Sequence, residues 1–203
     1  MIKDTYKFNE LIDDMINFRL NKSGDEVGDF NHCSVIFTKI NNELLKIVSY
    51  GNNKYMDNIN KNRNINQRHK CINKKVRVKT IHAESDAVNR LPPIMKINKK
   101  KMNINLVVIR VNKLGNLCNS MPCMHCIKMM YIKPRNMGYK IDKVYYSDNN
   151  GEIIYCKLND LLDEEIHISK FYEITGYDIN GWMKWRDMIK NKQMINLVKI
   201  III

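Results

Sequence analysis

The pattern of apolar and polar positions predicts an alternation of helices and short strands. Between Tyr6 and Leu20 the apolar residues recur at helical spacing, which predicts an amphipathic helix. Two β-branched runs, Cys33–Lys39 and Leu44–Tyr50, are separated by four mostly polar residues, so we expect a β-hairpin there. A second helix is predicted from near His82 to Leu91, because the pair Pro92-Pro93 then ends any helix.

The second half of the chain continues the alternation. Leu106–Val111 is an apolar run typical of a buried strand, and a third helix is predicted from Cys123 to about Tyr131. Lys143–Ser147 and Ile153–Leu158 read as strands joined by the turn Asp148–Gly151. A crossover helix needs a dozen or more residues, so these two strands should pair antiparallel. The expected fold class is α/β.

Three polar segments separate these elements, namely Asn21–Asn31, Lys54–Lys79 and Met95–Asn105. The residues from 112 to 121 are expected to form a loop that leads to the helix at Cys123. We expect residues 1–160 to form one domain and residues 161–203 a helical extension, packed on that domain or partly mobile. The extension contains an amphipathic stretch, Asp178–Asn191, whose two tryptophans are expected to be core residues.

The charge of the chain admits two interpretations. The 203 residues carry a formal net charge of +13, which is typical of nucleic-acid binding. The chain is also crowded with Asn, Lys and Ile, the residues of A/T-rich codons, and such a coding bias produces basic proteins without selection for binding. We favour coding bias, and keep nucleic-acid binding through Lys54–Lys79 as the alternative.

The composition also bears on location. The six cysteines are scattered rather than arranged as a disulfide framework, which fits a reducing compartment. No signal peptide is visible, and no apolar run approaches the roughly 20 residues that a membrane span needs. We therefore expect a cytoplasmic protein without a membrane partner.

Two short motifs carry the chemistry. Residues 81–84 read Ile-His-Ala-Glu and residues 122–126 read Pro-Cys-Met-His-Cys, so the chain holds H-x-E followed by P-C-x-x-C. His82, Cys123 and Cys126 are a ligand set suited to Zn²⁺, which takes three protein ligands in catalytic sites. Glu84 then serves as a general acid and base rather than as a ligand. This combination is the signature of zinc-dependent nucleobase deaminases.

Each motif alone is weak evidence for a particular function. A lone Cys-x-x-Cys also occurs in structural zinc sites and in redox dithiols, and only the joint order, with Pro122 before the first cysteine, favours the deaminase interpretation. His125 lies inside the second motif, but its side chain is expected to point elsewhere on the helix, as a wall residue rather than a ligand.

From Tyr6 to Leu158 the chain resembles the cytidine/deoxycytidylate deaminase superfamily, most specifically at the two motifs. The resemblance implies a three-layer α/β/α sandwich around a mixed five-stranded sheet with a C-terminal β-hairpin. It implies Zn²⁺ as cofactor, His82, Cys123 and Cys126 as metal ligands, and Glu84 as the proton shuttle. Gly51-Asn52-Asn53 resembles the Gly-x-Asn of the family, so Asn53 would meet the substrate, and Ala83 would present backbone groups to the base.

The resemblance does not fix the substrate. The first hypothesis is a hydrolase of nucleotide metabolism that converts cytosine to uracil in a nucleoside or nucleotide. The alternative is a base-editing deaminase acting on RNA or single-stranded DNA, and the third is a zinc-binding module without activity. Polymer editing needs basic residues interleaved with aromatics, and Lys54–Lys79 contains only Tyr55, so the small substrate is favoured. Self-association into a homo-oligomer is also expected, as in many relatives.

Overall fold

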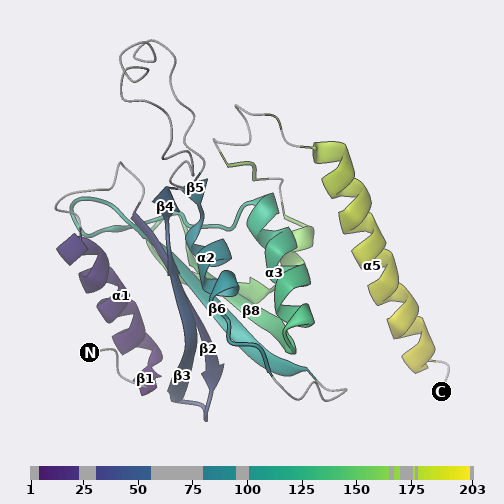
Figure 1. The fold of residues 1–203 in the computed structure, drawn as a ribbon, viewed down its shortest axis with the longest axis horizontal. Helices are drawn as coiled ribbons and strands as arrows, with labels where there is room; N and C mark the ends of the chain where they lie inside the picture. Colours follow the sequence, from purple (N-terminus) through teal and green to yellow (C-terminus); the bar gives the residue numbers. More distant parts are fainter. Residues whose placement is uncertain are drawn as a thin grey trace, which may run out of the picture.

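The computed structural model describes residues 5–22, 31–55, 80–94, 101–164, 167–169, 176 and 178–201. These residues form an α/β fold around an open, mixed β-sheet, with α1 on one face and α2 and α3 on the other (Figure 1). The segment 56–79, which holds almost all of the basic stretch noted above, lies outside the described residues, as does 95–100.

The main sheet has the strand order β1-β3-β2-β6-β8-β9, with β7 paired to β6 beside this path. Only the β6–β8 pair is parallel, and the other pairs are antiparallel. A separate short ribbon joins β4 to β5. The strands of the main sheet are β1 (Thr5–Lys7), β2 (Asn31–Lys39), β3 (Leu44–Asn52), β6 (Met102–Val111), β7 (Leu117–Cys118), β8 (Tyr139–Ser147) and β9 (Ile153–Lys157), and the ribbon is β4 (Lys54–Tyr55) and β5 (Thr80–Ile81).

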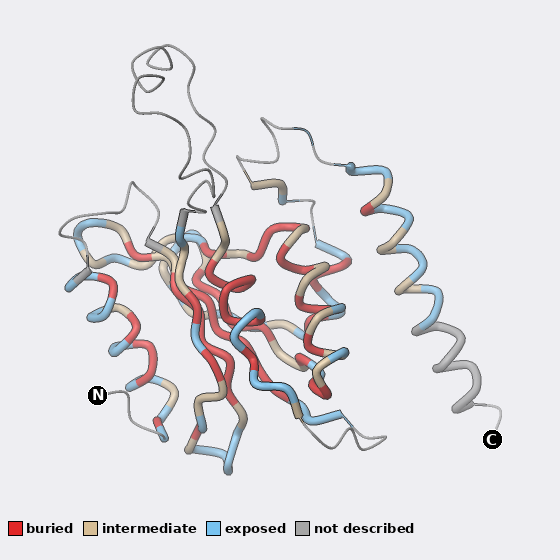
Figure 2. Tube along the Cα trace, in the orientation of Figure 1, coloured by how far each residue is buried: buried red, intermediate tan, exposed pale blue. Residues whose placement is uncertain are grey.

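The helices are α1 (Phe8–Lys22), α2 (Ala83–Asn89), α3 (Met124–Asn136) and α5 (Ile179–Ile201), with a 3₁₀ turn η2 at Asp160–Leu162. Alternate residues of each central strand face opposite layers. In β2, Ile36 packs with α2 and α3, whereas Val35 and Phe37 pack with α1. The sheet therefore separates two hydrophobic cores, which appear as the buried centre of the molecule in Figure 2.

The strand count differs from the expected five, because the main sheet has seven strands. All five expected strands are present, and the two additions are the short strands β1 and β7. In β1, Tyr6 is buried between exposed neighbours, which is a strand alternation, so α1 starts at Phe8 rather than near Tyr6. Strand β7 lies within the segment expected to be a loop, where Leu117 pairs with Val111.

Several element ends also differ from the sequence prediction. Strand β6 begins at Met102, inside the segment expected to be a linker, and β3 continues to Asn52. Helix α3 continues to Asn136 and contains Pro134, whose missing N–H falls in the last turn. Both predicted hairpins are confirmed, since β2 pairs antiparallel with β3 and β8 with β9.

The C-terminal helix α5 contacts α3 through aromatic side chains. Trp182 is buried, and its Nε1–H donates to the carbonyl of Met124, 3.2 Å away. Trp185 packs edge-on against Tyr131 of α3. Among the described residues, none of the helices combines the length and the apolar character that crossing a bilayer requires.

Candidate metal centre

The two sequence motifs meet at the starts of two helices. His82 is the N-cap of α2 and Cys123 is the N-cap of α3, both with extended backbone, and Cys126 lies in the first turn of α3. The Nδ1 atom of His82 lies 3.4 Å from the Sγ of Cys123 and 3.4 Å from the Sγ of Cys126. All three ligand atoms lie within 4.8 Å of one another, so the structure brings together the three side chains that the sequence assigned to a metal.

The spacing of these atoms fits a tetrahedral cation. Zinc–nitrogen and zinc–sulfur bonds at the tetrahedral angle separate N from S by about 3.6 Å. The observed 3.4 Å separations match this value, and two thiols with one imidazole are donors that a borderline-soft metal prefers. The described residues therefore form a site able to hold a metal ion.

Helix α2 is short and held tightly against the sheet. The hydroxyl of Ser34 in β2 donates to the Ala83 carbonyl at 2.8 Å, and the hydroxyl of Ser49 in β3 donates to the Ala87 carbonyl at 2.9 Å. At Gly51 an added Cβ would lie 2.2 Å from the Ala83 carbonyl oxygen and 2.2 Å from the Ala87 nitrogen. Only glycine allows this approach, so Gly51 fixes the position of the helix that carries His82.

A network of charged and polar groups surrounds Asp86 of α2. The carboxylate of Asp86 forms ion pairs with Lys54 at 2.6 Å and Arg90 at 3.2 Å, and it accepts the backbone N–H of Asn52 at 3.2 Å. Burial opposes ionisation, but Lys54, Asn52 and Arg90 together lower the pKa of Asp86. The network ties α2 to the end of β3, where Asn53 follows.

The carboxyl group of Glu84 is buried beside the cluster. Burial raises its pKa above the ordinary value, while the charge of His82 and a contact with Cys126 act in the opposite direction. Glu84 is not among the clustered ligand atoms. A buried carboxyl group outside the ligand set can act as a general acid and base next to a metal site.

The three ligand side chains form hydrogen bonds with one another, and these bonds shift their pKa values. The thiol of Cys126 hydrogen-bonds Cys123, which lowers the pKa of Cys123 and raises that of Cys126. Burial, the largest single cause, lowers the pKa of His82, but the hydrogen bond to Cys123 and the charges of Cys123 and Glu84 together raise it to about 9. A metal needs neutral imidazole and thiolates, so metal binding must displace protons from this cluster.

Asn53 and Ala83, the two residues expected to meet the substrate, lie side by side. The Ala83 N–H donates to the Oδ1 of Asn53 at 2.8 Å, and the Ala83 carbonyl accepts from Ser34. Both backbone groups of Ala83 thus already have partners, so a contact with a base would need Asn53 to turn away or the second lone pair of the carbonyl. Whether either residue contacts a substrate stays a prediction.

His32, at the start of β2, was not identified as a site residue from the sequence. Its Nδ1 lies 3.2 Å from the Nδ2 of Asn53, and its carbonyl accepts the Asn53 backbone N–H at 3.3 Å. His32 is separated from Asn53 by 21 positions, and only the β2–β3 pairing brings the two together. A lone histidine at a strand start gives no local signal for this contact.

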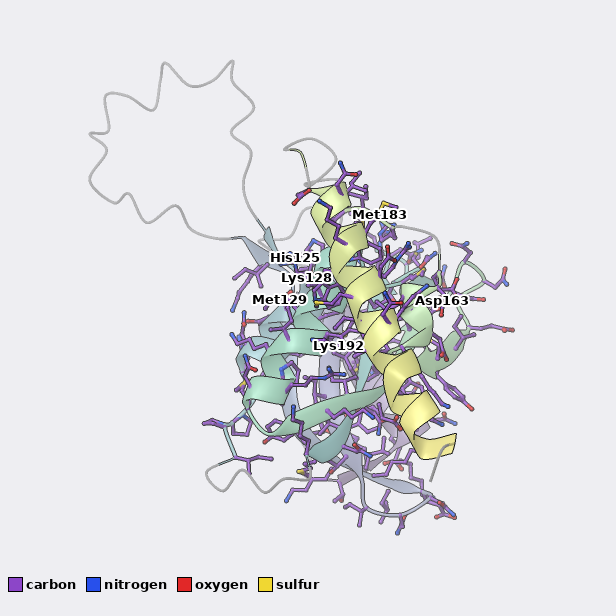
Figure 3. The ribbon with its side chains drawn as sticks, turned by 90° about the vertical axis from the view of Figure 1, so that its right-hand side faces the viewer. His125, Lys128, Met129, Asp163, Met183 and Lys192 are labelled. Carbon is purple, nitrogen blue, oxygen red and sulfur yellow. The ribbon has the colours of Figure 1, made fainter. Side chains whose placement is uncertain are left out.

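The start of α3 is fixed by the C-terminal part of the chain. The N–H of Met124, next to the ligand Cys123, donates to the carbonyl of His167 at 3.0 Å, and its carbonyl accepts from Trp182. His125 is not among the clustered ligand atoms. It lines a groove of about 360 Å³ between α3 and α5, together with Lys128, Met129, Ile132, Asp178, Gly181 and Trp182. Figure 3 shows α5 running past the side of α3 that carries His125, Lys128 and Met129.

Comparison with known proteins found no relative of this chain. No protein-family model, curated protein or solved structure matches the chain.

Proposed function

We propose that the protein is a zinc-dependent hydrolytic deaminase that converts cytosine to uracil in a nucleoside or nucleotide, with the architecture of the cytidine deaminase superfamily. The observation that carries the proposal is the convergence of His82, Cys123 and Cys126 beside the buried Glu84. Three clustered ligands are typical of catalytic zinc sites, and a carboxyl group outside the ligand set is what base deamination requires.

The arrangement of layers supports the same proposal. Both ligand-bearing helices lie on one face of the mixed sheet and meet at their N-termini. The superfamily architecture has five strands, which correspond here to β3, β2, β6, β8 and β9, and β1 and β7 are additions at its margins.

In this proposal the metal ligands and Glu84 have separate roles. His82, Cys123 and Cys126 would hold the zinc ion, which when bound supplies Lewis acidity and lowers the pKa of water to about 7. Glu84 would take one proton from water and pass it to the ring nitrogen of the base, and it would then pass the remaining proton of the added hydroxyl to the departing amine, which leaves as ammonia. Burial of Glu84 excludes bulk water and raises its pKa, which suits a group that must alternate between acid and base.

The test is ammonia release by the purified, zinc-loaded protein. Cytidine, deoxycytidine, their 5′-monophosphates and a cytosine-containing single-stranded oligonucleotide are supplied separately. Release from at least one cytosine nucleoside or nucleotide supports the proposal. Release from the oligonucleotide alone would replace it with the base-editing alternative, and release from none would refute both.

A further inference from the structure

The side chain of Asn53 accepts the first backbone N–H of helix α2. The Ala83 N–H donates to the Oδ1 of Asn53 at 2.8 Å, and Ala83 stands between the metal ligand His82 and Glu84. The first N–H groups of a helix have no acceptor within the helix. The N-cap residue His82 makes no capping bond with its own side chain, so Asn53 supplies the cap from just after β3.

This bond determines which way the amide of Asn53 faces. A backbone N–H can only donate, so the amide oxygen faces Ala83 and the amide nitrogen faces His32. The Nδ2 of Asn53 lies 3.2 Å from the Nδ1 of His32. An amide nitrogen can also only donate, so His32 must accept on Nδ1 and carry its ring proton on Nε2.

His32 holds Asn53 at a second point as well. The backbone carbonyl of His32 accepts the backbone N–H of Asn53 at 3.3 Å, so one residue of β2 fixes both the backbone and the amide of Asn53. A protonated ring would present a donor to the amide nitrogen, so the contact requires a neutral ring. Burial, the largest cause, lowers the pKa of His32 to about 3 and keeps the ring neutral. The positive charges that lower this pKa further belong to Arg110, His82, Arg19 and His167.

We propose that His32 is a positioning residue of the metal centre, which orients the Asn53 amide so that its oxygen fixes the backbone of Ala83. In the reversed orientation the amide nitrogen would face the Ala83 N–H, and two opposed donors would remove the cap of α2. Because His82 precedes Ala83 and Glu84 follows it, the cap sets the metal ligand and the buried carboxyl group relative to each other. The catalytic part of this inference rests on the proposed function.

The ring proton of His32 gives a test that needs no turnover. Long-range proton–nitrogen correlation spectra of the labelled, zinc-loaded protein identify which ring nitrogen carries the proton, and the signals lost in His32→Phe assign the residue. We expect the proton on Nε2, unchanged between about pH 5 and pH 8. In Asn53→Asp an oxygen faces Nδ1, so Nδ1 should gain a proton. A proton on Nδ1 in the wild type would overturn the proposal, and this measurement holds whether or not the variants fold.

The hold on Ala83 is measured by amide hydrogen exchange in the same protein. His32→Phe keeps a ring without the acceptor, so the Ala83 amide should exchange about 2- to 12-fold faster, the range of one ordinary hydrogen bond. His32→Gln offers an amide oxygen in place of Nδ1 and should restore part of the protection. The matched control is Cys33→Ala, which truncates the next residue of β2 on the side that packs with α1 and should leave Ala83 unchanged. Equal acceleration in His32→Phe and Cys33→Ala would reduce the effect to a loosened strand and overturn the proposal.

The outcomes separate the positioning role from the reaction. An Nε2 proton and Ala83 exchange that depends on His32, without ammonia release from any cytosine substrate, support the positioning role and refute the proposed function. Ammonia release by a wild type whose His32 carries its proton on Nδ1 supports the function and overturns the positioning role. Where the protein is active, kcat should fall in His32→Phe by a factor similar to that for exchange and stay unchanged in Cys33→Ala. An unchanged kcat in His32→Phe would refute the part of His32 in catalysis.

Discussion

Glu84 is the residue whose role is most specific to the proposed chemistry. It lies beside the ligand cluster without belonging to it, so Glu84→Gln should keep the metal and lose turnover. We expect a loss of at least about 100-fold in kcat, the lower range for removal of a general acid–base group. Elemental analysis and ammonia release on the same sample measure both quantities. Cys126→Ala is the contrasting variant, because it should lose the metal as well. A Glu84→Gln protein without metal would show that the carboxylate is a ligand.

The pKa values of the ligand side chains predict how metal binding depends on pH. The pKa of His82 is about 9 in the protein alone, and that of Cys126 is raised by its hydrogen bond to Cys123. Below these values each group must release a proton before it can bind a cation, so the affinity for zinc should rise with pH. The expected slope is about tenfold per pH unit for each proton displaced. Competition with a chelator between pH 6 and pH 8, approximately, measures the slope, and an affinity independent of pH would contradict this protonation scheme.

Gly51 is predicted to be intolerant of any side chain. In Gly51→Ala the new Cβ would approach two backbone atoms of α2 at 2.2 Å, and backbone cannot move aside as a flexible side chain can. We expect a loss of roughly 1–3 kcal/mol in the free energy of unfolding, the cost of an overpacked core. The metal affinity should fall as well, because the helix that begins after His82 must shift. Denaturant unfolding of the zinc-loaded protein gives the first value. An unchanged midpoint would mean that β3 and α2 are not packed this closely.

At the scale of elements, the metal site depends on how the N-termini of α2 and α3 are held. Trp182 of α5 donates to the Met124 carbonyl, in the residue after Cys123. Trp182→Phe keeps an aromatic ring but removes the indole donor to this buried carbonyl, which should cost about 0.5–1.5 kcal/mol of stability. Trp185→Phe is the control, since the described contacts of Trp185 are made by its ring. Equal effects of the two substitutions on unfolding would contradict a specific role for the Trp182 hydrogen bond.

Most helices and strands were predictable from the sequence, but the shortest strands and the end of α3 were not. Each hairpin followed from two apolar runs joined by a turn, a signal contained within fewer than about twenty residues. Strands β1 and β7 have three and two residues, too few for a period to stand out, and they exist because a longer strand offers them an edge. The end of α3 was placed too early, at about Tyr131, whereas the helix continues to Asn136 with Pro134 in its last turn.

At the scale of the whole molecule, the ligand set was predictable because its chemistry is encoded in two short motifs. The H-x-E and P-C-x-x-C spacings identify His82, Cys123, Cys126 and Glu84 without knowledge of the fold. The contact between Asn53 and His32 could not be found this way, because the two residues lie 21 positions apart and only the pairing of β2 with β3 brings them together. The net charge of +13 likewise says nothing about where an anion would bind.

The most direct test of the central claim is the origin of the oxygen in the product. Zinc-loaded protein is incubated with deoxycytidine 5′-monophosphate and with deoxycytidine in water enriched in oxygen-18, and the nucleotide or nucleoside is analysed by mass spectrometry. Hydrolytic deamination predicts a uracil product carrying one solvent oxygen, released together with ammonia, and no product from Glu84→Gln. Recovery of unchanged cytosine from every substrate, with zinc bound to His82, Cys123 and Cys126, would contradict the account and leave a metal-binding protein without deaminase activity.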